Sequence, residues 1–243
     1  MRVSVGRHLA ARGRRTRLFR YAEDVNPAPK SAAHSSPHAI SWAFAEAFVP
    51  ESDASTLARQ AAREMGLSSV SQGAASVLTF LAKAINARHV AEIGTGAGVS
   101  GLALLGGMAP DGILTSIDAE NEHQVAARQI FNAAGVPARR ARLIAGGALN
   151  VLPKLSDGAY DLVLIDGDPL EYVEYVAQAL RLLRHGGLLV LHHALWQGLV
   201  PDPTNEDDET LIVREALQAV TEIDDFTPML LPVGDGLLAA VKG

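Results

Sequence analysis

Residues 89–101 read HVAEIGTGAGVSG. A short apolar segment of the kind found in buried strands, 89–93, is followed by a glycine at every second position from 94 to 98. These glycines let the backbone turn sharply and let a ligand approach the main chain closely. A helix predicted over 98–107 would then direct its free amide groups toward that ligand. The stretch therefore predicts an α/β fold whose first strand leads into a ligand-binding loop.

The next apolar segment, ILTSID over 113–118, ends in an acid at the same edge of the predicted sheet. Asp118 stands twenty residues after Gly98. A carboxylate at the tip of the second strand can accept hydrogen bonds from both hydroxyls of a ribose. The loop and the acid together predict a cofactor that contains a nucleoside.

Further apolar segments alternate with helical ones along the chain. The predicted strands are 89–93, 113–118, 142–146, 160–166 and 187–193, and the predicted helices between them are 98–107, 121–134 and 170–184, with a short turn over 147–155. Strands joined by helices run parallel. Their apolar runs lack polar alternation, as expected for strands that are covered on both faces.

The end of the chain departs from this alternation. A helix predicted over 208–221 precedes two apolar segments, 227–233 and 237–242, which are joined through Gly234-Asp235-Gly236. Glycine flanking an acid between two strands is typical of a hairpin. The predicted fold is a doubly wound, mostly parallel sheet of about seven strands whose last strand is antiparallel.

The first 38 residues differ from the rest. The first twenty contain seven arginines and no acid, and a polar stretch rich in Pro, Ser and Ala follows where a signal peptide would be apolar. We interpret 1–38 as a flexible basic and polar arm; contact with RNA or a membrane and an extension without chemistry both remain open. The domain proper is predicted over 39–243, with helices at about 40–87 and Asp53 as one N-cap.

The overall composition limits the function classes. The chain has 243 residues, a hydrophobic fraction of 48% and a net charge of −6, which argues against nucleic acid as a partner. It has no cysteine, which excludes disulfides, thiolate metal sites and a cysteine nucleophile. No apolar run approaches the roughly 18 residues of a membrane span. We predict a cytoplasmic protein with no nucleic-acid or membrane partner.

Two cofactor classes fit the glycine loop. Residues 96–101, GAGVSG, satisfy the dinucleotide fingerprint, so an NAD(P)-dependent oxidoreductase is one alternative. Glu92 opposes it, since a carboxylate before the glycines would repel a pyrophosphate but could pair with an ammonium group. The chain also offers no evident second domain for a hydride-transfer substrate.

Several motifs together resemble one family. EIGTGAG, SIDAE, the GGAL turn, YDLVLIDGD, LLRHGGLLVLHHALWQG and the closing hairpin occur in order within about residues 55–243. They resemble class I S-adenosylmethionine-dependent methyltransferases, and more narrowly the catechol and caffeoyl-CoA O-methyltransferases. The resemblance implies a seven-stranded Rossmann-like sheet in the order 3-2-1-4-5-7-6 with strand 7 reversed.

The resemblance also implies S-adenosyl-L-methionine as the cofactor and assigns the residues around it. Those expected to bind it are Val70, Glu92, Gly94, Thr95, Gly96, Ser100, Asp118, Ala119, Gly147 and Ala148. Glu92, Gly94, Thr95 and Ser100 would surround the methionine part. Asp118 would hold the ribose, and Ala119, Gly147 and Ala148 the adenine. Taken alone, Val70 would be interpreted as a core residue and Ser100 as an N-cap-like helix residue.

The chain departs from this family where metal-dependent relatives bind a divalent cation. Those relatives have Asp-Ala-Asp-Lys after the fourth strand and Asp-Asn after the fifth; this chain has Asp166-Gly167-Asp168-Pro169 and His192-His193. Proline offers no base in place of the lysine. Magnesium is disfavoured, because it prefers six oxygen ligands, whereas imidazoles suit zinc, iron or nickel.

Three roles therefore remain open for the candidate catalytic residues Asp166, His192 and His193. They could hold a metal, act as a general base, or merely pack at the site. Neighbouring strand residues point to opposite faces, so both histidines could bind one ion only if the strand ends between them.

The sequence predicts an S-adenosylmethionine-dependent O-methyltransferase that acts on a hydroxyl of a small molecule. A non-catalytic protein that binds S-adenosylmethionine is a further alternative. The apolar helices over 53–86 allow a homodimer.

Overall fold

The computed structural model describes residues 37–243. The predicted arm lies outside the described residues, apart from residues 37 and 38, which belong to the first helix, α1 (Pro37–Glu46). No helix in the described part of the chain is long and apolar enough to cross a membrane.

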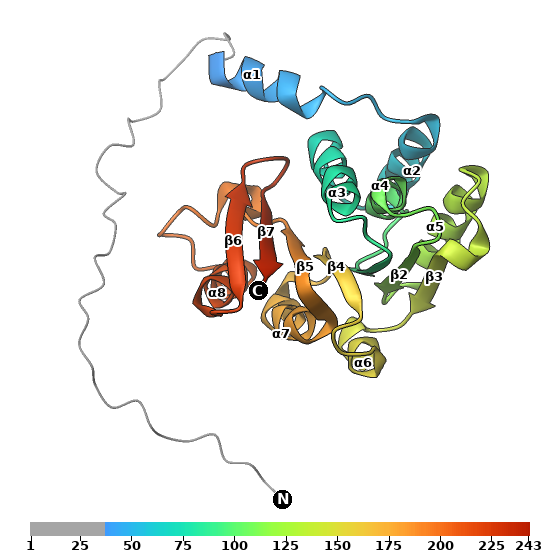
Figure 1. Cartoon of the computed structure of the whole chain (residues 1–243). Coiled ribbons are helices and arrows are strands. Elements are labelled where there is room, and N and C mark those ends of the chain that lie inside the picture. The colour runs from blue at the N-terminus through green and yellow to red at the C-terminus, as the bar shows by residue number, and fades with distance from the viewer. Residues whose placement is uncertain (1–36) are drawn as a thin grey trace, which may run out of the picture. The chain divides into compact units, whose positions relative to one another are not determined.

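Seven strands form one sheet in the order β3-β2-β1-β4-β5-β7-β6 (Figure 1). The strands are β1 (His89–Ile93), β2 (Ile113–Asp118), β3 (Ala141–Ala145), β4 (Tyr160–Ile165), β5 (Leu183–His192), β6 (Phe226–Leu231) and β7 (Leu237–Lys242). The first five pair in parallel, and β7 is antiparallel to both β5 and β6. This confirms the predicted order, the hairpin and the reversed strand.

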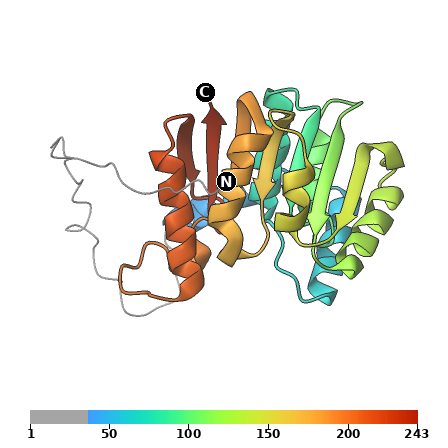
Figure 2. The ribbon, with the colours of Figure 1, turned by 90° about the horizontal axis from the view of Figure 1, so that it is seen from below.

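Helices cover both faces of the sheet (Figures 1 and 2). The helices α2 (Asp53–Glu64), α3 (Gln72–Ala84), α4 (Val99–Gly107) and α5 (Asn121–Ala133) lie on one face, and α6 (Ala148–Val151), α7 (Tyr172–Leu182) and α8 (Asp208–Glu222) on the other. Two cores result. On β4, Leu162 and Leu164 pack into one core and Val163 and Ile165 into the other. Both orientations of the strand are buried, which explains why the apolar run shows no polar alternation.

The predicted start of the fifth strand and the predicted N-cap at Asp53 were wrong. Strand β5 begins at Leu183, inside the region predicted as helix, because a bulge lets Leu183 pair with Tyr160 before Leu188 pairs with Leu162. The N-cap of α2 is Ser52, whose hydroxyl accepts a hydrogen bond from the amide of Ser55. Asp53 is instead the first residue within that helix.

The ends of β1 and β4 meet closely at the carboxyl edge of the sheet. The amide of Asp166 donates to the carbonyl of Ile93 over 2.8 Å. Gly94 has φ +93°, and a Cβ atom there would lie 2.0 Å from the carbonyl oxygen of Asp166. Glycine is therefore required at 94. Because it has no side chain, the loop after β1 can lie directly against the end of β4.

Candidate active site

A cavity of about 320 Å³ opens at the carboxyl ends of the parallel strands. This is where ligands bind in sheets of this type. Most of the sequence-predicted site residues line it: Val70, Gly94, Thr95, Gly96, Ser100, Asp118, Ala119, Gly147, Ala148 and Asp166. These ten residues come from six separate stretches of the sequence and share one cavity wall, whereas Glu92, His192 and His193 do not belong to it.

Asp118 organises the floor of this cavity. Its Oδ2 accepts hydrogen bonds from the amides of Thr95 and Gly96, at 3.0 and 2.9 Å. Its Oδ1 accepts from the amide of Glu120 and lies 3.0 Å from Nδ1 of His123. One carboxylate at the end of β2 thus fixes the glycine loop after β1. His123, on α5, also lines the cavity and was not predicted from the sequence. The one signal for it was its position five residues after Asp118.

Glu92 lies behind the glycine loop. Its side chain is fully buried, and its Oε2 accepts a hydrogen bond from Ser116 Oγ at 2.5 Å. Burial raises the pKa of this carboxyl from 4.5 to about 7, although hydrogen bonds from Ser116 and Ser100 oppose the increase. Neither Glu92 nor Ser116 lines the cavity, but Ser100, the other serine that donates to Glu92, does.

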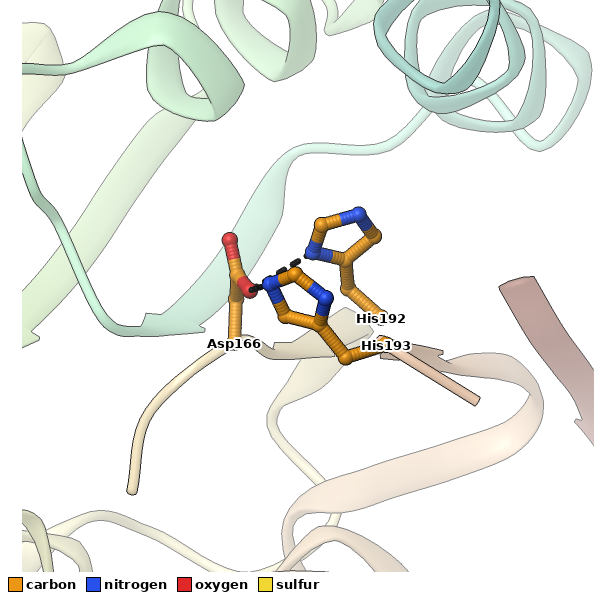
Figure 3. Close-up of side chains that lie close together, drawn as sticks. All are labelled: Asp166, His192 and His193. Carbon is orange, nitrogen blue, oxygen red and sulfur yellow. Dashed lines mark hydrogen bonds and ion pairs between the residues drawn. The ribbon is translucent and has the colours of Figure 1, made fainter. Parts of the chain in front are cut away.

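Asp166, His192 and His193 converge at the ends of β4 and β5 (Figure 3). Nδ1 of His192 lies 2.7 Å from Oδ1 of Asp166, and Nε2 of His193 lies 3.9 Å from the same oxygen. Strand β5 ends at His192, and His193 has φ +58°. This left-handed turn brings the two rings to a centroid separation of 4.0 Å. The strand therefore ends between the two histidines, as is required for both rings to act at one site.

The charge state of His192 depends on Asp166. Burial disfavours the imidazolium, but the negative charge and the hydrogen bond of Asp166 outweigh it and raise the pKa of His192 above 6.5. His192 is almost fully buried, whereas His193 keeps 19% of its side chain exposed. Of the two imidazoles, His193 is the more accessible to a substrate.

The family model for O-methyltransferases matches residues 49–242. This chain belongs to the O-methyltransferase family. It is 48% identical over 201 residues to "Probable O-methyltransferase Rv1220c" of Mycobacterium tuberculosis, covering 83% of this chain and 90% of that protein. A relative from Mycobacterium marinum, named as a putative O-methyltransferase, is 45% identical over 216 residues and covers 89% of this chain and 94% of its own length.

Solved structures agree with this assignment. A Corynebacterium glutamicum protein superposes with a TM-score of 0.77 at 33% identity, covering 82% of this chain and 94% of that one. The O-methyltransferase TomG from Streptomyces achromogenes, solved with S-adenosylmethionine, superposes with a TM-score of 0.75 at 30% identity and the same coverage. The prediction of an S-adenosylmethionine-dependent O-methyltransferase is confirmed over the oxidoreductase and the non-catalytic protein.

The cluster of Asp166, His192 and His193 does not fit magnesium. The group that could face one ion offers one carboxylate oxygen and two imidazole nitrogens, with its ligand atoms within 4.8 Å of one another. Magnesium requires near-octahedral oxygen ligands. Moreover, Nδ1 of each histidine already lies 2.7 Å from a carboxylate oxygen, that of Asp166 for His192 and that of Asp235 for His193.

The cavity wall of this O-methyltransferase is acidic. Four carboxylates line it, those of Asp118, Asp166, Asp168 and Glu171, and no lysine or arginine of the described chain does so. A pyrophosphate would be repelled there, whereas a positively charged sulfonium would be attracted. The electrostatics of the wall thus discriminate between the two cofactor classes that the glycine loop left open.

Proposed function

We propose that this enzyme methylates a hydroxyl group of a small molecule, and that Asp166 and His193 receive the acceptor. The observation that carries the proposal is the acidic cavity wall, which includes Asp166 and thereby reaches the histidine cluster. The cavity suits a cationic methyl donor, and the cluster beside it suits a group that loses a proton.

The cofactor residues take the following proposed roles. Asp118 accepts the ribose hydroxyls, and Ser100 donates to the carboxylate of the methionine part, beside Gly94, Thr95 and Gly96. Ala119, Gly147 and Ala148 enclose the adenine, and Val70 also contacts the cofactor. Glu92 acts indirectly, by holding Ser100 and Ser116 behind the loop. Support comes from the shared wall, which contains every one of these residues except Glu92 and Ser116.

The chemistry requires orientation and removal of one proton. When bound, S-adenosylmethionine would supply a methyl group on a positively charged sulfur; the acceptor oxygen would attack the methyl carbon in line, and the carbon–sulfur bond would break to leave a neutral thioether. The carboxylate of Asp166, beside Nε2 of His193, stabilises the positive charge that this ring gains when it takes a proton. Nε2 of His193 takes the hydroxyl proton as the new oxygen–carbon bond forms, and His192 holds the carboxylate of Asp166 in place.

We further propose that the enzyme is a homodimer that uses α1. This helix has no buried residue, and Ile40, Phe44 and the nearby Phe48 expose 61%, 69% and 70% of their surface. Phe44→Ser should halve the mass measured by light scattering, while Val125→Ser, at an exposed position of α5, should not change it. Equal masses for wild type and Phe44→Ser would refute this assembly. The cytoplasmic location stays a prediction.

Titration of the purified protein with S-adenosylhomocysteine and, separately, with NADH tests the cofactor. Binding of S-adenosylhomocysteine alone is expected, and binding of NADH alone would overturn the proposal. Release of S-adenosylhomocysteine in the presence of a panel of phenols, catechols and aliphatic alcohols then identifies the acceptor class. On the acceptor found, His193→Ala should lower kcat about 100-fold. Full activity of that variant would refute the role of His193.

A further inference from the structure

Asp235 occupies the turn of the last hairpin, between β6 and β7, and contacts the segment that follows β5. Its Oδ2 lies 2.7 Å from Nδ1 of His193, and its Oδ1 accepts a hydrogen bond from the amide of Gln197 at 2.6 Å. Its carbonyl accepts from the amide of Leu195 at 2.9 Å. One residue thus binds both the ring of His193 and the loop that carries it.

The backbone around His193 needs such support. His193, Trp196 and Gln197 have φ of +58°, +45° and +54°, a left-handed conformation that residues with a side chain adopt only at a cost. Gly236 allows the close approach, because a Cβ atom there would lie 2.7 Å from the backbone nitrogen of Leu195. The turn itself is held from behind, since the amide of Gly234 donates to Oε1 of Glu46 at 2.5 Å.

The contact between Asp235 and His193 decides which ring nitrogen carries the proton. A carboxylate only accepts hydrogen bonds, so a neutral His193 must place its proton on Nδ1. Its Nε2 then carries the lone pair. That nitrogen is the one that faces Asp166, 3.9 Å from Oδ1. The hydrogen bonds from the amides of Leu195 and Gln197 would hold the loop but would not select a tautomer of His193. Only the contact between Oδ2 of Asp235 and Nδ1 of His193 does so.

We propose that Asp235 is a positioning residue, which holds His193 in the tautomer and orientation that present a basic Nε2 beside Asp166. The proposal rests on the proposed role of His193 as proton acceptor. It assigns to the carboxylate of the hairpin turn a part in methyl transfer, although Asp235 is outside the cofactor cavity wall.

The variant Asp235→Asn separates this role from loop support. Its amide oxygen can still accept from Gln197, but its amide nitrogen would donate to Nδ1 of His193 and force the proton onto Nε2. We expect kcat on the acceptor found above to fall about 100-fold with an unchanged KM for S-adenosylmethionine. In a His193→Ala background, Asp235→Asn should cause no further loss. The matched control Asp225→Asn, at an exposed position before β6, should behave as wild type.

A spectroscopic measurement needs neither an acceptor nor turnover. In protein labelled with ¹⁵N-histidine at high pH, the His193 signals, assigned by their loss in His193→Gln, should show a protonated Nδ1 and an unprotonated Nε2. Asp235→Asn should reverse this pattern. A protonated Nε2 in the wild type would overturn the proposal even if the Asn variant did not fold, and so would wild-type kcat in Asp235→Asn.

The two proposals fail differently. If Asp235→Asn reverses the tautomer while His193→Ala keeps full activity, the positioning of His193 stands and its role as proton acceptor is wrong. If His193→Ala is inactive but the tautomer is the same in wild type and Asp235→Asn, the role of Asp235 is wrong.

Discussion

Nδ1 of His192 lies 2.7 Å from Oδ1 of Asp166, so a buried imidazole at the end of β5 is joined to a carboxylate at the end of β4. Because Asp166 raises the pKa of His192 in the folded protein, the pair stabilises the fold fully below the ordinary histidine pKa of 6.5. This stabilisation is lost as the pH rises through the raised pKa.

We therefore predict that His192→Gln lowers the free energy of unfolding by about 1–3 kcal/mol at pH 6. The difference between variant and wild type should become smaller as the pH rises. Urea unfolding at pH 6, 7, 8 and 9 measures it. A difference that stays constant or grows over this range would contradict the assigned direction of the pKa shift.

Glu92 should make its own contribution to pH-dependent stability. Its pKa is raised from 4.5 to about 7, so the folded state binds more protons than the unfolded state in this window and stability falls as the pH rises through it. The shift corresponds to about 3 kcal/mol. The stability of Glu92→Gln relative to wild type should increase by that order between pH 4.5 and pH 8. Glu174→Gln, at an exposed position of α7, serves as control, and parallel pH curves for wild type and Glu92→Gln would disprove the effect.

Two glycines of the same loop should respond very differently to alanine. Gly94→Ala meets both a positive φ and the carbonyl of Asp166, and we predict a loss of roughly 3 kcal/mol or more. At Gly96, with φ +47°, the nearest atom to a Cβ is 3.8 Å away, and Ala should cost about 1 kcal/mol. Thermal unfolding of both variants tests this ranking, which equal melting temperatures would exclude.

Removal of magnesium should leave catalysis unchanged. The donor set at Asp166, His192 and His193 does not fit magnesium, and the proposed proton transfer uses none. Assays without magnesium should therefore give the same kcat on the acceptor, whereas a magnesium-dependent caffeoyl-CoA O-methyltransferase assayed in parallel should lose activity. Restoration of a lost activity by magnesium would show that the cluster binds it after all.

The sheet and the cofactor cavity were predictable because they arise from local patterns. Each of these patterns can be recognised within a short stretch of sequence: the apolar runs, the glycines from 94 to 98, and Asp118 at a strand end. Because neighbouring parallel strands end at one edge, the proximity of Asp166 and His192 is a consequence of β4 and β5 lying side by side. The fold could therefore be predicted almost completely from the sequence, whereas His123, Asp168 and Glu171 of the cavity wall were not predicted.

Contacts between segments far apart in the chain could not be predicted in this way. Asp235 is 42 residues from His193, and Glu46 is 188 residues from Gly234. Nothing in the turn Gly234-Asp235-Gly236 distinguishes a solvent-exposed acid from one that binds an imidazole. The start of β5 was missed for another reason. The first residues of this strand continue the helical sequence pattern of α7, and they join the sheet only through a bulge.

The acidic cavity wall also bears on how the reaction ends. Methyl transfer converts a sulfonium into a neutral thioether, so the spent cofactor has one positive charge fewer than the fresh one. Asp118, Asp166, Asp168 and Glu171 attract the donor more strongly than its product. The same carboxylates that recruit the cofactor should thus favour its exchange after each turnover and limit inhibition by the product.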